Sequence, residues 1–175
     1  MGEERRDLDA FRHAMLPHMD AAYAYARFLS RDSVAAEDLV QDAYLRAFRG
    51  FAGYRGGDAK AWLLAIVRTC FLDWTRRRGG HAAEPAWDDE DRASAVADCA
   101  DTPEEALIRA ADANALRRAV DGLPEPFRET LVLRELEEMS YREIGDLMKV
   151  PLGTIMSRLS RARRMLTASL AGGGV

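Results

Sequence analysis

The fold of the second half of the chain is decided by residues 140–166, which read SYREIGDLMKVPLGTIMSRLSRARRML. Ser140 and Glu143 have the spacing of a capping box, which predicts a helix that begins directly after Ser140. A short turn through Pro151 follows, and a second helix is expected from there to beyond Leu166. The apolar residues of this second helix recur every three or four positions and predict one buried face: Ile155, Leu159, Ala162 and Leu166.

The other face of the second helix carries arginines and short polar side chains. Two helices joined by about three residues, with the second one basic, are typical of a DNA-binding helix-turn-helix, whose second helix fits the major groove. Gly145 leaves room where the two helices meet. Arginine pairs with guanine through two hydrogen bonds, and serine or threonine reaches a base or a phosphate. The alternative is a solvated basic helix end that complements the helix dipole. The residues expected to face DNA are Thr154, Met156, Ser157, Arg158, Ser160, Arg161 and Arg164.

The composition of the 175-residue chain excludes several classes of protein. It is 48% hydrophobic and 31% charged, as in ordinary globular proteins, and no apolar run is long enough for a membrane span. The start of the chain has no apolar core, so no secretory signal is expected. Cys70 and Cys99 are expected as free thiols in a reducing cytoplasm. Neither a phosphate-binding glycine loop nor metal-ligand spacing is found, so the sequence predicts no enzyme, no cofactor and no metal site.

The formal net charge is −4, but the charge is unevenly distributed. Residues 60–78 carry five bases and one acid, and residues 139–170 carry six bases and two acids. Between them, residues 79–112 carry ten acids and two bases. Residues 79–101 are rich in Gly, Ala and Asp without a helical stripe, which predicts a flexible acidic linker. The linker would join two domains, residues 1–78 and 102–171.

Both domains are expected to be helical, because no segment alternates apolar and polar residues as a strand does. The first is predicted to be a bundle of three to four helices, over about residues 8–29, 35–48 and 59–78. The second is predicted to contain four helices, over about residues 103–120, 126–136, 141–148 and 151–166. The expected buried face of the helix over 35–48 is Leu39, Val40, Ala43, Tyr44, Ala47 and Phe48. That of the helix over 59–78 is Trp62, Leu63, Ile66, Val67, Cys70 and Trp74.

Five segments of this all-α chain resemble one family. Residues 123–129 (LPEPFRE), 137–145 (EEMSYREIG) and 151–163 (PLGTIMSRLSRAR) resemble domain four of bacterial extracytoplasmic-function (ECF) sigma factors. Residues 37–48 (EDLVQDAYLRAF) resemble the segment of their domain two that binds core polymerase. Residues 60–68 (KAWLLAIVR) resemble the promoter-melting helix that follows. The segments cover nearly the whole chain in the order that the family has.

The resemblance implies a dissociable subunit that directs core RNA polymerase to promoters and starts transcription. Domain two would bind the clamp region of the largest polymerase subunit through Asp38, Gln41, Asp42 and Leu45. From the residues alone, that set is an ordinary solvated helix face. Domain two would also recognise and melt the −10 element through Phe51, Tyr54, Arg55, Lys60, Arg68, Thr69, Arg76 and Arg77. Domain four would read the −35 element and contact the flap of the second-largest subunit. A cognate anti-sigma factor is expected as a regulator.

Two other functions stay open at this point. A stand-alone transcriptional regulator would use the same helix-turn-helix without polymerase. A sigma mimic that sequesters an anti-sigma factor would carry a receiver domain and a degraded DNA-reading helix, whereas this chain retains Arg158, Arg161 and Arg164. The loop before residue 59 is open as well, because Phe51 and Tyr54 either hold an unstacked base or plug the loop onto the helices.

Overall fold

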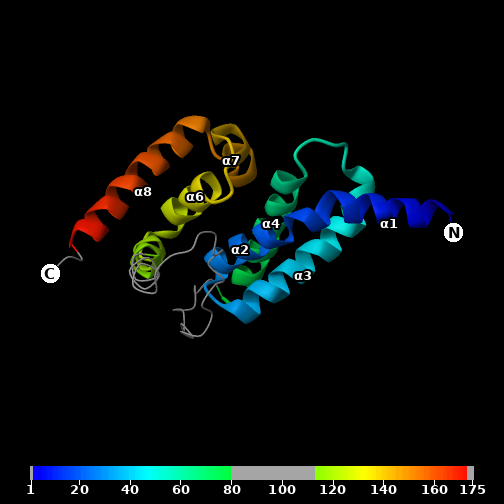
Figure 1. Cartoon of the computed structure of the whole chain (residues 1–175), viewed down its shortest axis with the longest axis horizontal. Helices are drawn as coiled ribbons and strands as arrows, with labels where there is room; N and C mark the ends of the chain where they lie inside the picture. Colours follow the sequence, from blue (N-terminus) through cyan, green and yellow to red (C-terminus); the bar gives the residue numbers. More distant parts are fainter. Residues whose placement is uncertain (1, 80–112, 173–175) are drawn as a thin grey trace, which may run out of the picture.

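The computed structural model describes residues 2–79 and 113–172, and these residues are helical throughout, apart from turns (Figure 1). The first domain contains α1 (Gly2–Met15), α2 (Met19–Ser30), α3 (Ser33–Gly50) and α4 (Ala59–Arg77), with 3₁₀ turns η1 (Leu16–His18) and η2 (Phe51–Gly53). The second contains helical residues 113–121 and then α6 (Glu125–Glu135), α7 (Tyr141–Met148) and α8 (Leu152–Gly172). The predicted all-α architecture is confirmed. The predicted linker, residues 79–101, lies outside the described residues apart from Gly79.

Three helices begin at a side chain that accepts a hydrogen bond from the first turn. Asp32 accepts from the backbone N–H of Ala35 at the start of α3, and Asp58 accepts from that of Ala61 at the start of α4. Ser140 accepts from the N–H of Glu143 while the Glu143 carboxylate accepts from the N–H of Ser140, which confirms the predicted capping box. These side chains fix the start of each helix, because the first N–H groups of a helix have no partner within it.

The predicted helix over residues 8–29 is wrong, because the chain forms two helices there. The 3₁₀ turn Leu16–His18 separates α1 from α2 and contains Pro17. Proline has no N–H to donate and its ring clashes with the preceding turn, so it interrupts an α-helix at this point. The break lets α1 extend away from the bundle while α2 packs into its centre (Figure 1).

The core of the first domain forms where α2, α3 and α4 pack together. On α3, burial is confirmed for Leu39, Ala43 and Ala47. The prediction is wrong for Phe48, which is 48% exposed although its ring meets that of Phe11 edge-on, with centroids 5.2 Å apart. On α4, Leu63, Val67 and Cys70 are buried as predicted, whereas Trp62, Ile66 and Trp74 are only half-buried. Two residues outside the predicted stripe, Leu64 and Phe71, are also buried.

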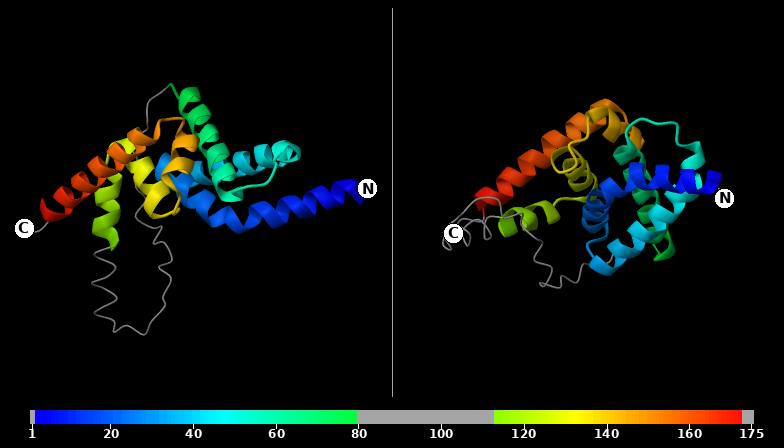
Figure 2. Two further views of the ribbon diagram at one scale, coloured as in Figure 1. Left: turned by 90° about the horizontal axis from the view of Figure 1, so that it is seen from above. Right: turned by 45° about the vertical axis from the view of Figure 1, so that its right-hand side comes forward.

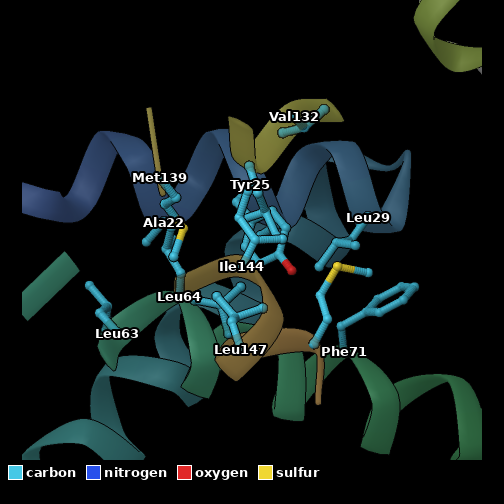
Figure 3. Packing of buried hydrophobic residues seen from close by; sticks show 14 of the residues in the cluster. Ala22, Tyr25, Leu29, Leu63, Leu64, Phe71, Val132, Met139, Ile144 and Leu147 are labelled. Carbon is cyan, nitrogen blue, oxygen red and sulfur yellow. The ribbon is translucent and has the colours of Figure 1, made fainter. Parts of the chain in front are cut away.

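The extra burial on α4 arises because the two domains pack against each other. α6 contacts α2 and α7 contacts α4, and two further views show the second domain against this side of the first (Figure 2). Tyr25 and Leu64 belong to the same hydrophobic cluster as Ile144 and Leu147 of α7. These side chains point into one common space (Figure 3). The sequence predicts two separate modules, and the structure places a continuous apolar core across both.

Candidate nucleic-acid interface

The helix-turn-helix of the second domain consists of α7 and α8. Ile144 of α7 and Ile155 of α8 are both fully buried. Gly145 sits where they come closest, since a Cβ there would be 3.1 Å from the Val150 carbonyl oxygen. Lys149 ends α7 in the left-handed region, with φ of 59°. This tight turn fixes the angle at which α8 leaves the domain, as a DNA-reading helix requires.

The predicted DNA-facing residues of α8 all lie on its accessible side. Thr154 and Arg158 are half-buried, and the other five are exposed: Met156, Ser157, Ser160, Arg161 and Arg164. Within the part of the chain that the structure describes, Arg158, Arg161 and Arg164 form no salt bridge. The neighbouring Arg163 differs, because its guanidinium binds Glu135 of α6 at 2.7 Å. The three arginines are therefore available to an external anion.

The predicted DNA-facing residues of α4 are placed differently. Arg68 is 21% exposed, and its Nε lies 2.7 Å from Oε1 of Glu129 in the second domain. The Lys60 ammonium donates to the backbone carbonyl of Glu137 and lies 3.8 Å from the carboxylate of the same residue. Thr69 donates its hydroxyl to the carbonyl of Ala65 one turn earlier. Two of the predicted bases are thus paired with acids of the second domain.

Arg76 and Arg77, the remaining bases of this set, lie exposed near the end of α4. Arg76 is 3.5 Å from the Asp73 carboxylate, and Arg77 donates to the Asp73 carbonyl. An exposed ion pair of this kind contributes little to stability, so a phosphate can replace the acid at small cost. These two arginines are accessible in a way that Lys60 and Arg68 are not.

Glu129 is the centre of the polar contact between the domains. It is only 5% exposed, and one of its carboxylate oxygens accepts hydrogen bonds from the Tyr25 hydroxyl at 2.6 Å and from Arg68 at 2.7 Å. Burial raises the pKa of Tyr25 well above its usual value, and the negative charge of Glu129 raises it further. Sequence reasoning missed Tyr25, Glu129 and Glu137, because nothing local marks them as partners of α4.

The loop before α4 uses its aromatic rings for packing. The ring of Phe51 meets Phe11 edge-on at 5.3 Å and stacks on Tyr54 at 5.6 Å. Tyr54 also contacts Trp62, with ring centroids 5.1 Å apart, and its hydroxyl donates to the Gly57 carbonyl. Both rings remain half-buried rather than buried, and Arg55 beside them is exposed. In this arrangement the rings plug the loop onto the helices while each keeps an accessible part.

The predicted polymerase-binding residues lie along α3. Asp38, Gln41 and Leu45 are exposed, with Leu45 56% exposed. Asp42 is half-buried and lies 2.9 Å from the guanidinium of Arg46, which also binds Asp73 of α4 at 2.7 Å. The hydrogen bond from Arg46 lowers the pKa of the Asp73 carboxyl. Asp42 therefore has an internal partner, whereas Asp38 has its carboxylate in solvent.

Comparison with known families identifies the two domains. The family model described as Sigma-70 region 2 matches residues 15–80, and the one described as Sigma-70, region 4 matches residues 113–166. The ECF RNA polymerase sigma factor EcfG of Rhodopseudomonas palustris is 31% identical over 163 residues, which are 93% of this chain and 86% of that protein. The chain belongs to the ECF sigma factors. The first domain is region 2 and the second domain is region 4. Sigma factors are non-enzymatic, which confirms that the chain is not an enzyme.

Two further comparisons agree. The ECF RNA polymerase sigma factor SigE of Mycolicibacterium smegmatis is 38% identical over 154 residues, which are 88% of this chain. The chain spans 59% of the length of that relative. The sigma factor RpoE from Bartonella quintana, solved in complex with the anti-sigma factor NepR, superposes with a TM-score of 0.72 at 31% identity. That match covers 93% of this chain and 97% of the other.

The described residues contain neither a metal-binding cluster nor a membrane-spanning helix. Among residues 2–79 and 113–172, no group of three His, Cys, Asp or Glu side chains is arranged to hold a metal ion. None of the helices in the described part of the chain combines the length and the apolar character needed to cross a bilayer. Cys70 is a free, buried thiol whose pKa is raised by burial to about 12.

Proposed function

We propose that this chain recruits core RNA polymerase to promoters with two recognition elements and initiates transcription there. The observation that carries the proposal is the face of α8, where Arg158, Arg161 and Arg164 form no salt bridge with residues 2–79 or 113–172 and lie on the second helix of a helix-turn-helix. Such a helix contacts base edges in the major groove. We assign the −35 element to the accessible residues of this helix: Thr154, Met156, Ser157, Arg158, Ser160, Arg161 and Arg164.

The −10 element is assigned to α4 and the loop before it. Lys60, Arg68, Thr69, Arg76 and Arg77 lie along α4, where basic side chains contact the DNA backbone and position it. Phe51, Tyr54 and Arg55 lie in the loop, where a half-buried ring can stack on an unpaired base. Stacking of this kind contributes about 1–3 kcal/mol per base, which is comparable with the cost of extruding a base.

The surface of α3 is assigned to core polymerase. Asp38 and Gln41 present polar groups, and Leu45, one turn after Gln41, adds an exposed apolar side chain. An exposed apolar residue beside polar ones fits a modest protein interface. We assign this surface, with Asp42 at its edge, to the clamp region of the largest polymerase subunit and region 4 to the flap of the second. The chain acts in the cytoplasm, where the polymerase is.

A regulatory partner is the last part of the proposal. The Bartonella quintana sigma factor that this chain resembles was solved with an anti-sigma factor. We therefore propose that a cognate anti-sigma factor binds this chain as well. Adding that protein to a run-off assay should abolish transcripts that depend on the chain, while transcripts from another sigma factor continue.

The experiment that tests the function is promoter selection with reconstituted holoenzyme. A library randomised at both elements is transcribed by core polymerase with the purified chain, and the templates that yield run-off transcripts are sequenced. Recovery of two conserved elements at a fixed spacing supports the proposal. DNA binding without core polymerase and without promoter opening would support a stand-alone regulator, and the absence of any polymerase-dependent transcript would contradict the proposal.

A further inference from the structure

A pocket of about 350 Å³ lies where the last turns of α4 face the start of α6. Region 2 lines this α4–α6 pocket with Leu29, Phe71 and Trp74, and region 4 lines it with Leu123 and Pro124. Leu29 of α2 and Phe71 of α4 lie at the same end of the buried cluster (Figure 3). The volume is at the lower end of the range for small-molecule sites, so the pocket suits a ligand of about one or two rings.

Two arginines line the same pocket, one from each domain. Arg31 ends α2, and Arg128 lies one turn into α6. Both guanidiniums donate to the backbone carbonyl of Asp121, and that of Arg128 also donates to the carbonyl of Leu123 at 3.2 Å. Among the described residues, no carboxylate forms an ion pair with either arginine. Two positive charges therefore lie at one pocket with neutral hydrogen-bond partners.

The surroundings of the two guanidiniums are unfavourable without an anion. Arg128 is only 6% exposed, and burial lowers the pKa of its guanidinium, which the charge of Arg31 lowers further. The Nε of Arg31 is buried and has no hydrogen-bond partner within the described part of the chain. Burying a donor without an acceptor is costly, and so is holding two like charges near each other. A bound anion would relieve both costs, because its oxygens accept from Nε and its charge offsets the guanidiniums.

The start of α6 adds to the positive potential of the pocket. Pro124 precedes this helix and Glu125 is its first residue, and both line the pocket. No side chain caps the helix, and the N-terminal end of a helix carries partial positive charge that favours an anion. Glu125 supplies one negative charge among the lining residues, whereas Arg31 and Arg128 supply two positive ones. The lining therefore keeps a net positive charge.

We propose that the α4–α6 pocket binds a small organic phosphate with an aromatic body, such as a nucleoside monophosphate. The phosphate group binds Arg31 and Arg128, because its several terminal oxygens can accept from two guanidiniums at once. The aromatic body lies against the wall formed by Leu29, Phe71 and Trp74. Neither arginine belongs to the residues assigned to DNA or to core polymerase, so the site does not depend on those assignments.

Calorimetric titration of the full-length chain tests the class of ligand. Adenosine monophosphate, adenosine and inorganic phosphate are titrated separately. Adenosine monophosphate should bind about tenfold or more tightly than either of the others, because the charged group and the apolar body both contribute. If inorganic phosphate or adenosine binds as tightly as the nucleotide, or if the nucleotide does not bind at millimolar concentration, the proposal is wrong.

Phenyl phosphate distinguishes two sources of the same chemistry. Equal affinity for phenyl phosphate and adenosine monophosphate would indicate a site for aryl phosphates in general, and tighter binding of the nucleotide would indicate a nucleotide site. Either result supports the ligand class, provided that both compounds bind more tightly than inorganic phosphate. Weaker binding of both compounds than of inorganic phosphate would contradict the aromatic part of the proposal.

Variants of Arg31 test the place of binding. Arg31→Gln should lower the affinity for adenosine monophosphate about tenfold, because it removes a charged donor. Arg31→Lys keeps the charge and removes Nε, so it guards against misfolding of the first variant and should lower the affinity several-fold. Arg118→Gln is the matched control, because it removes the same charge from an exposed position outside the pocket lining, and its affinity should change less than about twofold. Circular dichroism establishes that each variant is folded. If folded Arg31 variants bind the nucleotide as the control does, the site is wrong.

The fluorescence of Trp74 gives an independent test of the place. The chain has three tryptophans, and Trp62→Phe/Trp87→Phe leaves Trp74 as the only one. Adenosine monophosphate should change the fluorescence of this variant with the same Kd that calorimetry gives, because the ligand lies against the residues that surround Trp74 in the pocket. Calorimetric binding without a change in Trp74 fluorescence would place the ligand outside the pocket and overturn the proposal.

Discussion

The basic residues of α4 and those of α8 differ in what already binds them. On α8, Arg161 and Arg164 are exposed and Arg158 is half-buried, and none of the three has an acidic partner among the described residues. On α4, Arg68 and Lys60 are paired with carboxylates of the other domain. Both helices belong to basic segments of the sequence, so local composition does not distinguish them. The difference comes only from how the domains pack.

The two helices therefore differ in whether DNA can reach their basic residues. DNA can reach α8 while the two domains are packed together, whereas Lys60 and Arg68 become available only when their ion pairs with region 4 are broken. A buried pair stabilises little compared with a well-packed apolar contact, yet removing one partner is costly because the other stays buried without its counter-charge. Removing one member of these pairs alone is therefore expected to destabilise the chain.

The largest expected effect comes from Glu129→Ala, which removes the carboxylate that pairs with Arg68 of α4. The change leaves Arg68 and the Tyr25 hydroxyl without their acceptor, so the free energy of unfolding should fall by about 3 kcal/mol. Urea denaturation of the full-length chain measures it. Glu135→Ala removes an exposed pair on the same helix and should lower that free energy by only about 0.5 kcal/mol. Equal losses of unfolding free energy in the two variants would show that the Glu129 contacts stabilise the chain no more than an exposed ion pair does.

The next effect tests whether the exposed arginines of α8 contact bases. Arg161→Ala should cost about 1–3 kcal/mol of discrimination between the selected −35 element and a mutated one, because a guanidinium bound to a base edge distinguishes that base. Holoenzyme binding to both promoters measures it. Arg142→Ala, which removes an exposed charge from α7, should lower both affinities by the same factor. An unchanged −35 preference in Arg161→Ala would place this arginine away from the bases.

A smaller effect comes from the pH dependence of the α4 contacts. The pKa of Tyr25 is raised by burial and by Glu129, so the contribution of Tyr25 to stability is complete below the unperturbed value near 10. As the pH rises above that value, the free energy of unfolding should fall by up to about 1.4 kcal/mol per pH unit. Urea denaturation of the full-length chain between pH 9 and pH 11 measures this fall. Tyr25→Phe should show a shallower fall, and identical profiles would mean that Tyr25 does not titrate on unfolding.

The smallest effect concerns α3, which lies outside both basic surfaces. Asp38→Arg should weaken binding to core polymerase about fivefold, because a rim charge of the wrong sign slows association. Asp38 is a cleaner probe than Asp42, because Asp42 also pairs with Arg46. Competition for core against another sigma factor measures the loss, and Asp9→Arg on exposed α1 is the control. Equal competition by both variants would move the polymerase surface elsewhere.

Local patterns predicted the parts of the fold that local interactions determine. The Ser140 capping box and the stripe from Ile155 to Ala162 fixed both helices of the helix-turn-helix. The close approach at Gly145 was also predictable, because only a missing side chain admits it. The break at Pro17 was also predictable, because proline interrupts helices, but the prediction followed the apolar spacing and placed one continuous helix there.

Contacts between the domains were beyond local reasoning. Glu129 is 104 residues from Tyr25 and 61 from Arg68, and its neighbours in the sequence give no sign that it is buried. Leu64 and Phe71 lie off the predicted stripe of α4 because that stripe describes the helix within region 2 alone. Pairing across domains depends on the relative position of two bundles, which no periodicity in either bundle encodes.

The distance between the domains tests most directly whether they separate when the chain binds core polymerase and a promoter. Spin labels at Val34→Cys on α3 and Ser169→Cys on α8, both exposed positions, report this distance in a chain that also carries Cys99→Ser. Cys70 can stay, because its thiol is buried and its pKa is raised to about 12. The free chain should give one narrow distance distribution, and the promoter-bound holoenzyme should give a longer one. The same distance in the free chain and in an actively transcribing holoenzyme would contradict the account.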